Sequence, residues 1–335
     1  MKSQIHIDEI LGSSKTRYFG NGYKHVSHVL RNISVEPNNN QISAEISIGY
    51  PADWSKKETS KELKPHLSTI DAYVISCQMV EAFIVHSQLL NAEERKQSWV
   101  RKLAIKAGKS PVNDLNNVSF KGVYEGTYPE INSLNKHISS FHLQLAGFTI
   151  DLELDHGPTN GVVNLEKCNF DSIEEILPSK SMSYYGGQYK NLHHDIVINE
   201  ANAQLLRSEI AIEKGEDYQA NTNLSAEHSS YYNPLDILIS CAQLCQVLMY
   251  EIDNLDRTNT KNLWMRSINV YCPKPIIKEG NLPMTIRVEK SKLLEKGNAE
   301  WRFAELSADT SLDSACFLEA SVAHEVATIT APEPA

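Results

Sequence analysis

Two stretches decide the fold of this chain: IDAYVISCQMVEAFIV (residues 70–85) and LDILISCAQLCQVLMY (residues 235–250). Each predicts a helix, and Asp71 of the first matches Asp236 of the second at an offset of 165 residues. Apolar residues occur on nearly every face of the first helix, so it cannot lie on a surface with one wet side. Other parts of the chain must wrap around it.

The same offset recurs along the chain, which predicts two copies of one structural unit. The further pairs at 165 are Gln78 with Gln243, Trp99 with Trp264, and Arg101 with Arg266. Upstream, the strand-like ISAEISIG resembles LRSEIAIE, with Glu45 opposite Glu209 at an offset of 164. We interpret the duplicated Trp and Arg as packing residues, because residues kept in both copies are most easily explained by folding.

Strand-like patterns with period two precede and follow each helix. A long antiparallel sheet curled around one apolar helix is the hot-dog arrangement, and two such units usually join edge to edge. The predicted class is therefore α+β, a tandem double hot-dog in which each half is a curled antiparallel sheet around a buried central helix. The predicted parts are a first hot-dog domain (1–160), a linker rich in Gly, Pro, Ser and Asn (161–190), a second hot-dog domain (191–326) and a flexible tail (327–335).

Composition narrows the classes of function. The formal charge of −10 and the absence of a Lys/Arg cluster argue against a nucleic-acid partner. The first residues contain no apolar leader and no stretch reads as a membrane span, so we expect a cytoplasmic protein. The cysteines are scattered without a compact spacing pattern, and we expect reduced thiols rather than a disulfide framework. They are Cys77, Cys168, Cys241, Cys245, Cys272 and Cys316.

The candidate site lies at the start of the first helix, where unpaired amides and the helix dipole can polarise a carbonyl. Asp71 is the candidate base there, with a helix-start role as the alternative. His66 lies just before the helix and is the candidate acid–base partner of Asp71. His228 occupies a comparable loop before the second helix, and the alternative for either histidine is an exposed loop residue.

Six further residues are candidates for substrate binding: Gln78, Glu81, Lys24, His25, His28 and Gln243. Gln78 falls on the same helix face as Asp71, although a structural hydrogen bond would explain both glutamines equally well. Glu81 occurs only in the first copy, because Gln246 stands at the matching position. The Lys24, His25 and His28 segment could receive an anionic or polyhydroxylated group, and a plain turn is the alternative. We identify no metal-ligand set and expect no cofactor.

The segment SSKTRYFGNGYKHVSHVL (13–30), together with the length and the paired helices, resembles the avirulence D (AvrD) family over most of the chain. More distantly, YYNPLDILISCAQLCQVLMY (231–250) is similar to the second central helix of the A-factor synthase (AfsA) type, with its D-P-L-x-x-A-E-x-x-x-Q pattern. Pro234, Leu235 and Gln243 fit that pattern. The glutamate of the pattern falls on Ile239, so a catalytic Glu cannot be carried over.

These resemblances imply an enzyme that joins a 3-oxoacyl group, from an acyl carrier protein or coenzyme A thioester, to a sugar-like hydroxyl acceptor such as a pentulose. The product would be an acyl-sugar or syringolide-like signal or elicitor. The alternatives are an acyl-thioester dehydratase or thioesterase, and a non-catalytic module that binds an acyl ligand or a protein. Because His66, Glu81 and the His25/His28 segment have no clear counterparts in register, we expect the working site in the first copy.

Overall fold

The computed structural model describes residues 4–328 except for 56–63, 132, 134, 258–259, 261–262, 296–298 and 311–315. Most of the predicted flexible tail, from residue 329 onward, lies outside the described residues. Within the described part, one 14-stranded sheet dominates the fold, in the order β1-β9-β10-β14-β15-β16-β12-β4-β7-β6-β5-β3-β2-β8. The expected α+β class, with a large antiparallel sheet and few helices, is confirmed.

The same order of elements occurs twice along the chain. The first run is β2 (Ser27–Glu36), β3 (Gln41–Gly49), α2 (Thr69–Ser87), β4 (Trp99–Lys106), β5 (Val118–Pro129), β6 (His137–Leu145) and β7 (Phe148–His156). The second run is β9 (Leu192–Ala201), β10 (Leu205–Lys214), α4 (Pro234–Asp253), β12 (Trp264–Tyr271), β14 (Leu282–Glu295), β15 (Ala299–Asp309) and β16 (Phe317–Thr328). The strand orders β2-β3-β5-β6-β7-β4 and β9-β10-β14-β15-β16-β12 are equivalent. We call these runs the first and second halves.

Shorter elements complete the described fold. The short strands and helices are β1 (Ile5–His6), α1 (Ile7–Leu11), α3 (Ala92–Gln97), β8 (Cys168–Ser172), β11 (Tyr231–Tyr232) and β13 (Ile276–Ile277). The 3-10 turns are η1 (Ser14–Thr16), η2 (Gly22–His25), η3 (Pro37–Asn39), η4 (Ile173–Glu175), η5 (Lys180–Met182), η6 (Gln188–Asn191) and η7 (Ala226–Ser230).

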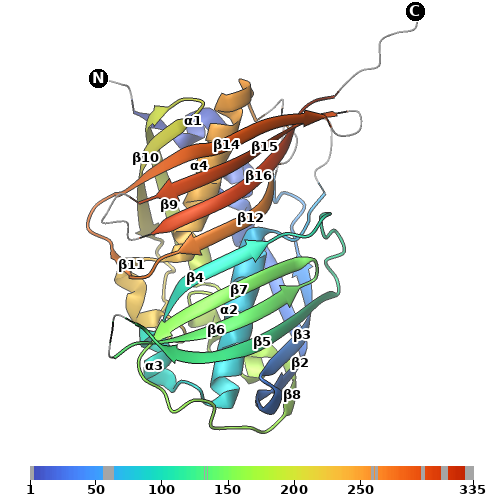
Figure 1. The fold of residues 1–335 in the computed structure, drawn as a ribbon, viewed down its shortest axis with the longest axis vertical. Helices are drawn as coiled ribbons and strands as arrows, with labels where there is room; N and C mark the ends of the chain where they lie inside the picture. Colours follow the sequence, from blue (N-terminus) through green and yellow to red (C-terminus); the bar gives the residue numbers. More distant parts are fainter. Residues whose placement is uncertain are drawn as a thin grey trace, which may run out of the picture.

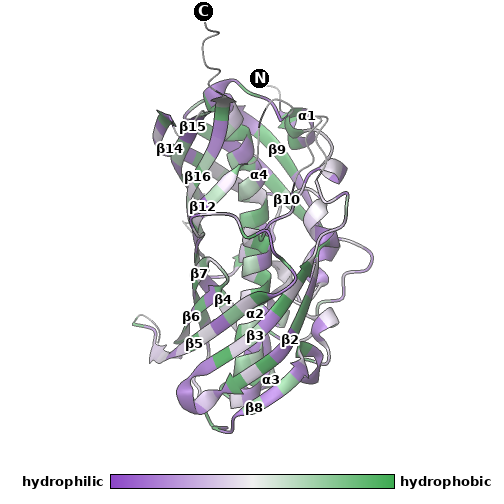
Figure 2. Ribbon diagram, turned by 90° about the vertical axis from the view of Figure 1, so that its right-hand side faces the viewer, coloured by the Kyte–Doolittle hydropathy of each residue, from purple (hydrophilic) through white to green (hydrophobic). Residues whose placement is uncertain are grey.

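The two halves join through β4 and β12, which pair antiparallel and make one continuous sheet (Figure 1). In the side view, α2 and α4 run down the middle of the molecule, with the β2/β3 and β9/β10 strands on one side and β4–β7, β12 and β14–β16 on the other (Figure 2). Each helix is therefore flanked on two sides by its own half of the sheet. This explains why the helical sequences are apolar on nearly every face.

Burial of the two central helices is nearly complete. Every residue of α2 from Thr69 to Ile84 is buried, and so is every residue of α4 from Pro234 to Cys245. By length and composition α4 could cross a membrane, but 83% of its most apolar window is buried inside the protein, as in the core helix of a soluble protein. Both helices therefore form the core of the molecule.

The duplicated arginines occupy the same irregularity in both halves. The pairing of β4 with β7 skips Arg101, and the pairing of β12 with β16 skips Arg266. Each arginine is thus the extra residue of a β-bulge, a feature that redirects a side chain. Arg101 donates a hydrogen bond to Glu130 at 3.0 Å, whereas Arg266 donates to the Gly108 carbonyl at 2.9 Å.

The segment predicted as a linker contributes to the packed structure. Its β8 pairs with β2 at the edge of the sheet, and the side chains of Tyr184, Tyr185 and Tyr189 are buried. Aromatic burial of this extent stabilises the packing between the halves. The domain boundaries remain a prediction.

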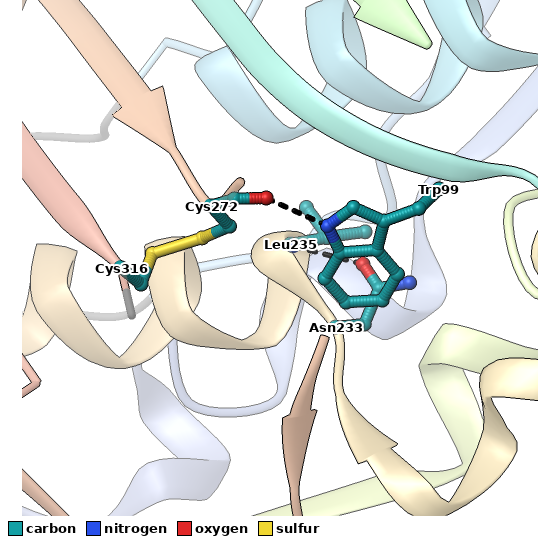
Figure 3. The surroundings of a disulfide bond; sticks show 5 residues. All are labelled: Trp99, Asn233, Leu235, Cys272 and Cys316. Carbon is teal, nitrogen blue, oxygen red and sulfur yellow. Dashed lines mark hydrogen bonds between the residues drawn. A yellow bond between two sulfur atoms is a disulfide. The ribbon is translucent and has the colours of Figure 1, made fainter. Parts of the chain in front are cut away.

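The expectation that all cysteines are reduced is wrong for one pair. Cys272, which follows β12, forms a disulfide with Cys316, which precedes β16 (Figure 3). The sequence positions are 44 residues apart, but β12 and β16 are neighbours in the sheet, which brings the two ends together. The indole of Trp99 donates a hydrogen bond to the Cys272 carbonyl at 2.7 Å and so ties the disulfide to the first half.

Candidate functional site

A cavity of about 440 Å³ opens at the N-terminal end of α2, the end that the sequence singled out. Both halves line it. The aromatic residues of its wall are Tyr18, Phe19, Tyr50, Trp54 and Phe148 from the first 156 residues, and Trp264, Trp301 and Phe303 from the second half. A concave, largely apolar space of this size with a few polar groups is typical of a small-molecule site.

Polar backbone groups face this cavity where α2 begins. Ser68 caps the helix, because its hydroxyl accepts the Asp71 amide at 3.1 Å. Thr69 lines the cavity, and among the described residues neither the Thr69 nor the Ile70 amide meets an acceptor. The first turn of a helix leaves such amides unpaired and places positive partial charge there. This end of α2 can therefore bind the carbonyl oxygen of a ligand.

Asp71 does not line the cavity, because its carboxylate is fully engaged behind the wall. Oδ1 lies 2.8 Å from His28 Nε2, and Oδ2 accepts the Ser68 amide at 3.0 Å, the Ser68 hydroxyl at 2.7 Å and the Tyr50 hydroxyl. Burial raises the pKa of Asp71, but the hydrogen bond and charge of His28, followed by the Tyr50 and Ser68 hydrogen bonds, outweigh it and lower that pKa. Asp71 is thus an ionised anchor for the groups that do face the cavity.

Two tyrosines connect this anchor to the cavity. The Tyr18 hydroxyl lies 2.5 Å from Ser68 Oγ, and the Tyr50 hydroxyl bridges Asp71 and the His66 carbonyl, the latter at 3.1 Å. Both tyrosines line the cavity. Burial and the charge of Asp71 raise their pKa values, so both hydroxyls keep their protons at neutral pH. Sequence reasoning did not identify either tyrosine.

His66 faces the cavity, as the candidate acid–base residue should. Its ring stacks against Trp264 of the second half at a centroid distance of 5.0 Å, and its Nδ1 lies 3.4 Å from the Lys64 carbonyl. Burial lowers the pKa of His66, only partly offset by the Lys64 carbonyl and by Asp71, which favours the neutral ring. A ring that donates from Nδ1 presents Nε2 as an acceptor. The predicted direct pairing of His66 with Asp71 is wrong, because Asp71 contacts His28 instead.

The charged residues of the cavity wall are all cations. Arg17, Lys109, Arg257 and Arg266 line it, and among the described residues no Asp or Glu does. Arg257 donates a hydrogen bond to the carbonyl of Thr16 at 2.8 Å, directly before Arg17 in the chain. In a chain with a formal charge of −10, this distribution favours an anionic ligand group.

The remaining candidates for substrate binding lie elsewhere. Gln78 donates to the Tyr185 carbonyl at 2.9 Å, and Gln243 accepts from Arg17 at 2.8 Å, so each glutamine holds the other half in place. Both serve the structural hydrogen bonds that were the alternative. None of the six candidates is among the residues that line the cavity, within the part of the chain that the structure describes.

Lys24 donates to the Leu192 carbonyl at 2.7 Å, and His25 is exposed. Glu81 is buried on α2, where it accepts the Leu224 amide at 2.9 Å. Burial raises the pKa of Glu81 to about 7, against the charge of Arg95 and the Leu224 hydrogen bond. These three residues also lie away from the cavity.

The N-terminal end of α4 carries a closed counterpart of this site. Asp236 occupies the same helix position as Asp71, and His194 occupies the place of His28 on the first strand of its half. Tyr184 donates to Asp236 Oδ1 at 2.6 Å, whereas His194 Nε2 lies 3.4 Å from that oxygen without hydrogen-bond geometry. The space beside Asp236 is only about 10 Å³, roughly enough for one water.

A second repeat explains the buried tyrosines that the sequence analysis missed. YFGNGYK (18–24) matches YYGGQYK (184–190) at an offset of 166, and the second copy lies in the segment predicted as a linker. Tyr18 and Tyr184 approach the helix-start aspartates of their own halves. Extending the search for repeats into the Gly-rich segment would have found them.

Metal ligation has no support in this region. Within the described residues, no group of three or more His, Cys, Asp or Glu side chains could hold a metal ion.

Comparisons with known proteins give a family for the chain and a set of solved structures with a similar fold. The model of the Pseudomonas avirulence D protein (AvrD) family matches residues 2–326, and no curated protein matches the chain. Among solved structures, the tesB protein of Mycobacterium avium subspecies paratuberculosis is 7% identical with a TM-score of 0.41, over 93% of this chain and 99% of that one. The 12:0-ACP thioesterase from Umbellularia californica is 7% identical with a TM-score of 0.42, over 85% and 94% of the two chains. A MaoC-like dehydratase is 7% identical with a TM-score of 0.40, over 98% of each chain. Likeness at this level assigns no activity.

Proposed function

The chain belongs to the Pseudomonas avirulence D protein (AvrD) family, and from that premise we propose that it is an acyl-thioester enzyme that joins a 3-oxoacyl group to a hydroxyl of a sugar-like acceptor such as a pentulose. The observation that carries the proposal is the 440 Å³ cavity, which combines an aromatic wall with the open N-terminal end of a buried helix. The aromatic wall can accommodate an acyl chain, and the helix N-terminus can polarise a thioester carbonyl. The product would be an acyl-sugar of the syringolide-like type.

The fold supports the same proposal. The equivalent strand orders and the matching bulges favour a tandem double hot-dog that arose by duplication of one unit. In that arrangement the pre-helix loop of one half and the strand after the helix of the other build one cavity. We place the reaction in the cavity at the N-terminal end of α2.

The carbonyl oxygen of the thioester would lie against the Thr69 and Ile70 amides. Negative charge that develops on this oxygen during attack is stabilised by those amides and by the helix dipole. Removing one such donor from an acyl-transfer site typically slows the reaction by roughly 10²- to 10³-fold. Tyr18 donates to Ser68 Oγ, whose own proton goes to Asp71, and thereby fixes the capping residue at this end of the helix.

His66 is the proposed base. Its neutral ring takes the proton from the acceptor hydroxyl at Nε2 while that oxygen attacks the thioester carbonyl carbon. The carbon–sulfur bond then breaks, and the leaving thiolate takes the same proton from His66, so atoms and charge balance. Asp71 does not touch the reacting atoms and acts as a positioning residue through Tyr50 and Ser68.

The cations are the proposed contacts for the carrier. Coenzyme A and the prosthetic arm of acyl carrier protein both contain phosphate, and Arg17, Arg257, Arg266 and Lys109 are the charged residues of the wall. An anionic group held there would direct the thioester toward the apolar part of the cavity.

The experiment is turnover of a 3-oxoacyl-coenzyme A with and without a pentulose, followed by mass spectrometry of the thiol and acyl products. We expect an acyl-sugar, and we expect His66→Ala to lower its rate by roughly 10²-fold or more. The matched control is His228→Ala, because His228 also contacts a tryptophan of the other half, Trp99, but does not line the cavity. The control should stay within about twofold of the wild type, in the range of a surface substitution.

Two outcomes would contradict the proposal. Free acid without acyl-sugar would identify a thioesterase, and loss of water from a 3-hydroxyacyl thioester would identify a dehydratase. Equal activity of the His66→Ala and wild-type proteins would remove His66 from the mechanism.

A further inference from the structure

A segment of the second half reaches the central helix of the first. His228 meets Trp99 edge to face at a centroid distance of 5.2 Å, whereas His66 lies tilted against Trp264 at 5.0 Å. The segment 222–225, which precedes His228, contacts α2 through Leu224, which is fully buried and donates its amide to Glu81. We call these four residues the plug. The open cavity has no such segment among the described residues that line it.

The plug is held by its backbone and not by complementary side chains. The Leu224 amide donates to Glu81 Oε1 at 2.9 Å, and the Ser225 amide donates to the Arg95 carbonyl at 3.0 Å. Asn223 and Ser225 have φ values of 70° and 64°, which non-glycine residues rarely adopt. Among the described residues, the buried Thr222 Oγ1, Asn223 Nδ2 and Ser225 Oγ atoms meet no partner. These two backbone hydrogen bonds, together with the β-bridge between Thr222 and Ser183, hold the plug in the described structure.

Glu81 on α2 therefore accepts a hydrogen bond from the peptide N–H of Leu224 in the plug. Its counterpart in the open cavity is Gln246, since both residues follow the helix-start aspartate of their own helix by ten positions. Gln246 lines the cavity, and its Nε2 donates to the Tyr250 hydroxyl at 2.7 Å. Its Oε1 meets no donor among the described residues. Gln246 thus carries an acceptor oxygen without a donor among the described residues, at the helix position where Glu81 receives the plug.

We infer that Gln246 positions the ligand of the open cavity by accepting a hydrogen bond from an amide N–H of an extended arm, as Glu81 accepts the Leu224 amide of the plug. The inference rests on the proposed function, because the pantetheine arm of a coenzyme A or carrier-protein thioester is such an amide-bearing chain. It adds a specific contact, which distinguishes an arm with an amide from a simple fatty acid. The neutral glutamine suits this task, because an amide oxygen accepts a hydrogen bond without placing a charge in the cavity.

The test compares two ligands by calorimetric titration of the full chain. S-octyl-pantetheine has the amide-bearing arm and a thioether that cannot be cleaved, whereas octanoate has the alkyl chain without an amide. For Gln246→Leu we expect roughly three- to tenfold weaker binding of S-octyl-pantetheine, the loss typical of one neutral hydrogen bond, and less than about twofold change for octanoate. Retained octanoate binding also shows that the variant folds.

Gln246→Glu keeps an acceptor at this position and should bind S-octyl-pantetheine within about threefold of the wild type. An equal loss of both ligands in Gln246→Leu, or no loss of either, would overturn the role of Gln246 and leave the proposed function standing. Failure of the wild type to bind either ligand would overturn the proposed function itself.

Discussion

At the N-terminal end of α2, both oxygens of the buried Asp71 accept hydrogen bonds, whereas at the matching end of α4 the Oδ2 atom of Asp236 meets no partner among the described residues. The cavity near Asp71 is nevertheless the larger one, with about 440 Å³ against about 10 Å³ beside Asp236. The same residue type at the same helix position thus belongs to an open site in one half and to a closed one in the other. The aspartate alone therefore does not decide which half offers space to a ligand.

The largest expected effect tests the different engagement of the two aspartates. Asp71→Ala leaves His28, Tyr50 and the Ser68 amide without their acceptor, and breaking such a buried pair should lower the free energy of unfolding by roughly 3–5 kcal/mol. Asp236→Ala removes one hydrogen bond, from Tyr184, and should cost roughly 1–3 kcal/mol. Urea unfolding at pH 7 measures both, and equal losses would show that the two ends are energetically alike.

The disulfide gives the next effect, because it lies only at the closed end. Cys272 and Cys316 close a loop of 44 residues, while Ala107, at the position matching Cys272, lines the open cavity. Chain-entropy arguments give a disulfide of this span about 4 kcal/mol. Thermal unfolding of wild type and the double variant Cys272→Ala/Cys316→Ala should differ under oxidising conditions and converge with excess dithiothreitol. A melting temperature of the wild type that dithiothreitol leaves unchanged would contradict this.

Glu81, which holds the plug, should make the free energy of unfolding depend on pH. Its pKa is raised from 4.5 to about 7 in the folded protein, which corresponds to a change of about 3 kcal/mol. The folded state then holds the proton more tightly than the unfolded state, so the favourable contribution is complete below pH 4.5 and is lost as the pH rises through 7. The stability of the wild type relative to Glu81→Gln should fall by this amount between pH 4.5 and 8. Unfolding of both proteins across this range measures it, and a difference independent of pH would sink the idea.

The smallest effect concerns a residue near neither helix end. His25 is exposed, and the described structure records no hydrogen bond from its side chain. His25→Ala should change the free energy of unfolding by less than about 0.5 kcal/mol and leave turnover unaltered. A loss of acyl-sugar product in this variant would mean that the ligand extends well beyond the cavity.

The sequence predicted the parts of the fold that depend on local pattern. The apolar helices, the strands around them and the 165-residue repeat were all visible, because periodicity reports burial directly. The disulfide was not, since it depends on which strands become neighbours in the sheet. The cysteines that it joins are 44 residues apart and follow no compact motif.

The candidate site was predicted in place but not in composition. His66 and the start of α2 do meet in one cavity, as expected from their closeness in sequence. The groups that sequence reasoning missed come from far along the chain: Arg257 and Trp264 from the other half, and Tyr18 from the first residues. His28 was assigned to the ligand but binds Asp71, because β2 passes beside α2 and delivers it there.

The contacts between the two YxGxxYK segments have a consequence for the chain as a whole. Lys24 donates to the Leu192 carbonyl and Lys190 donates to the Val26 carbonyl, at 2.7 and 2.6 Å, while Tyr23 stacks on Tyr189. A lysine that precedes each half thus donates a hydrogen bond to the start of the other half. These reciprocal contacts resemble those across a twofold homodimer interface. The covalent connection raises the effective concentration of the two halves. Because both halves belong to one chain, a substitution changes one half without changing the other.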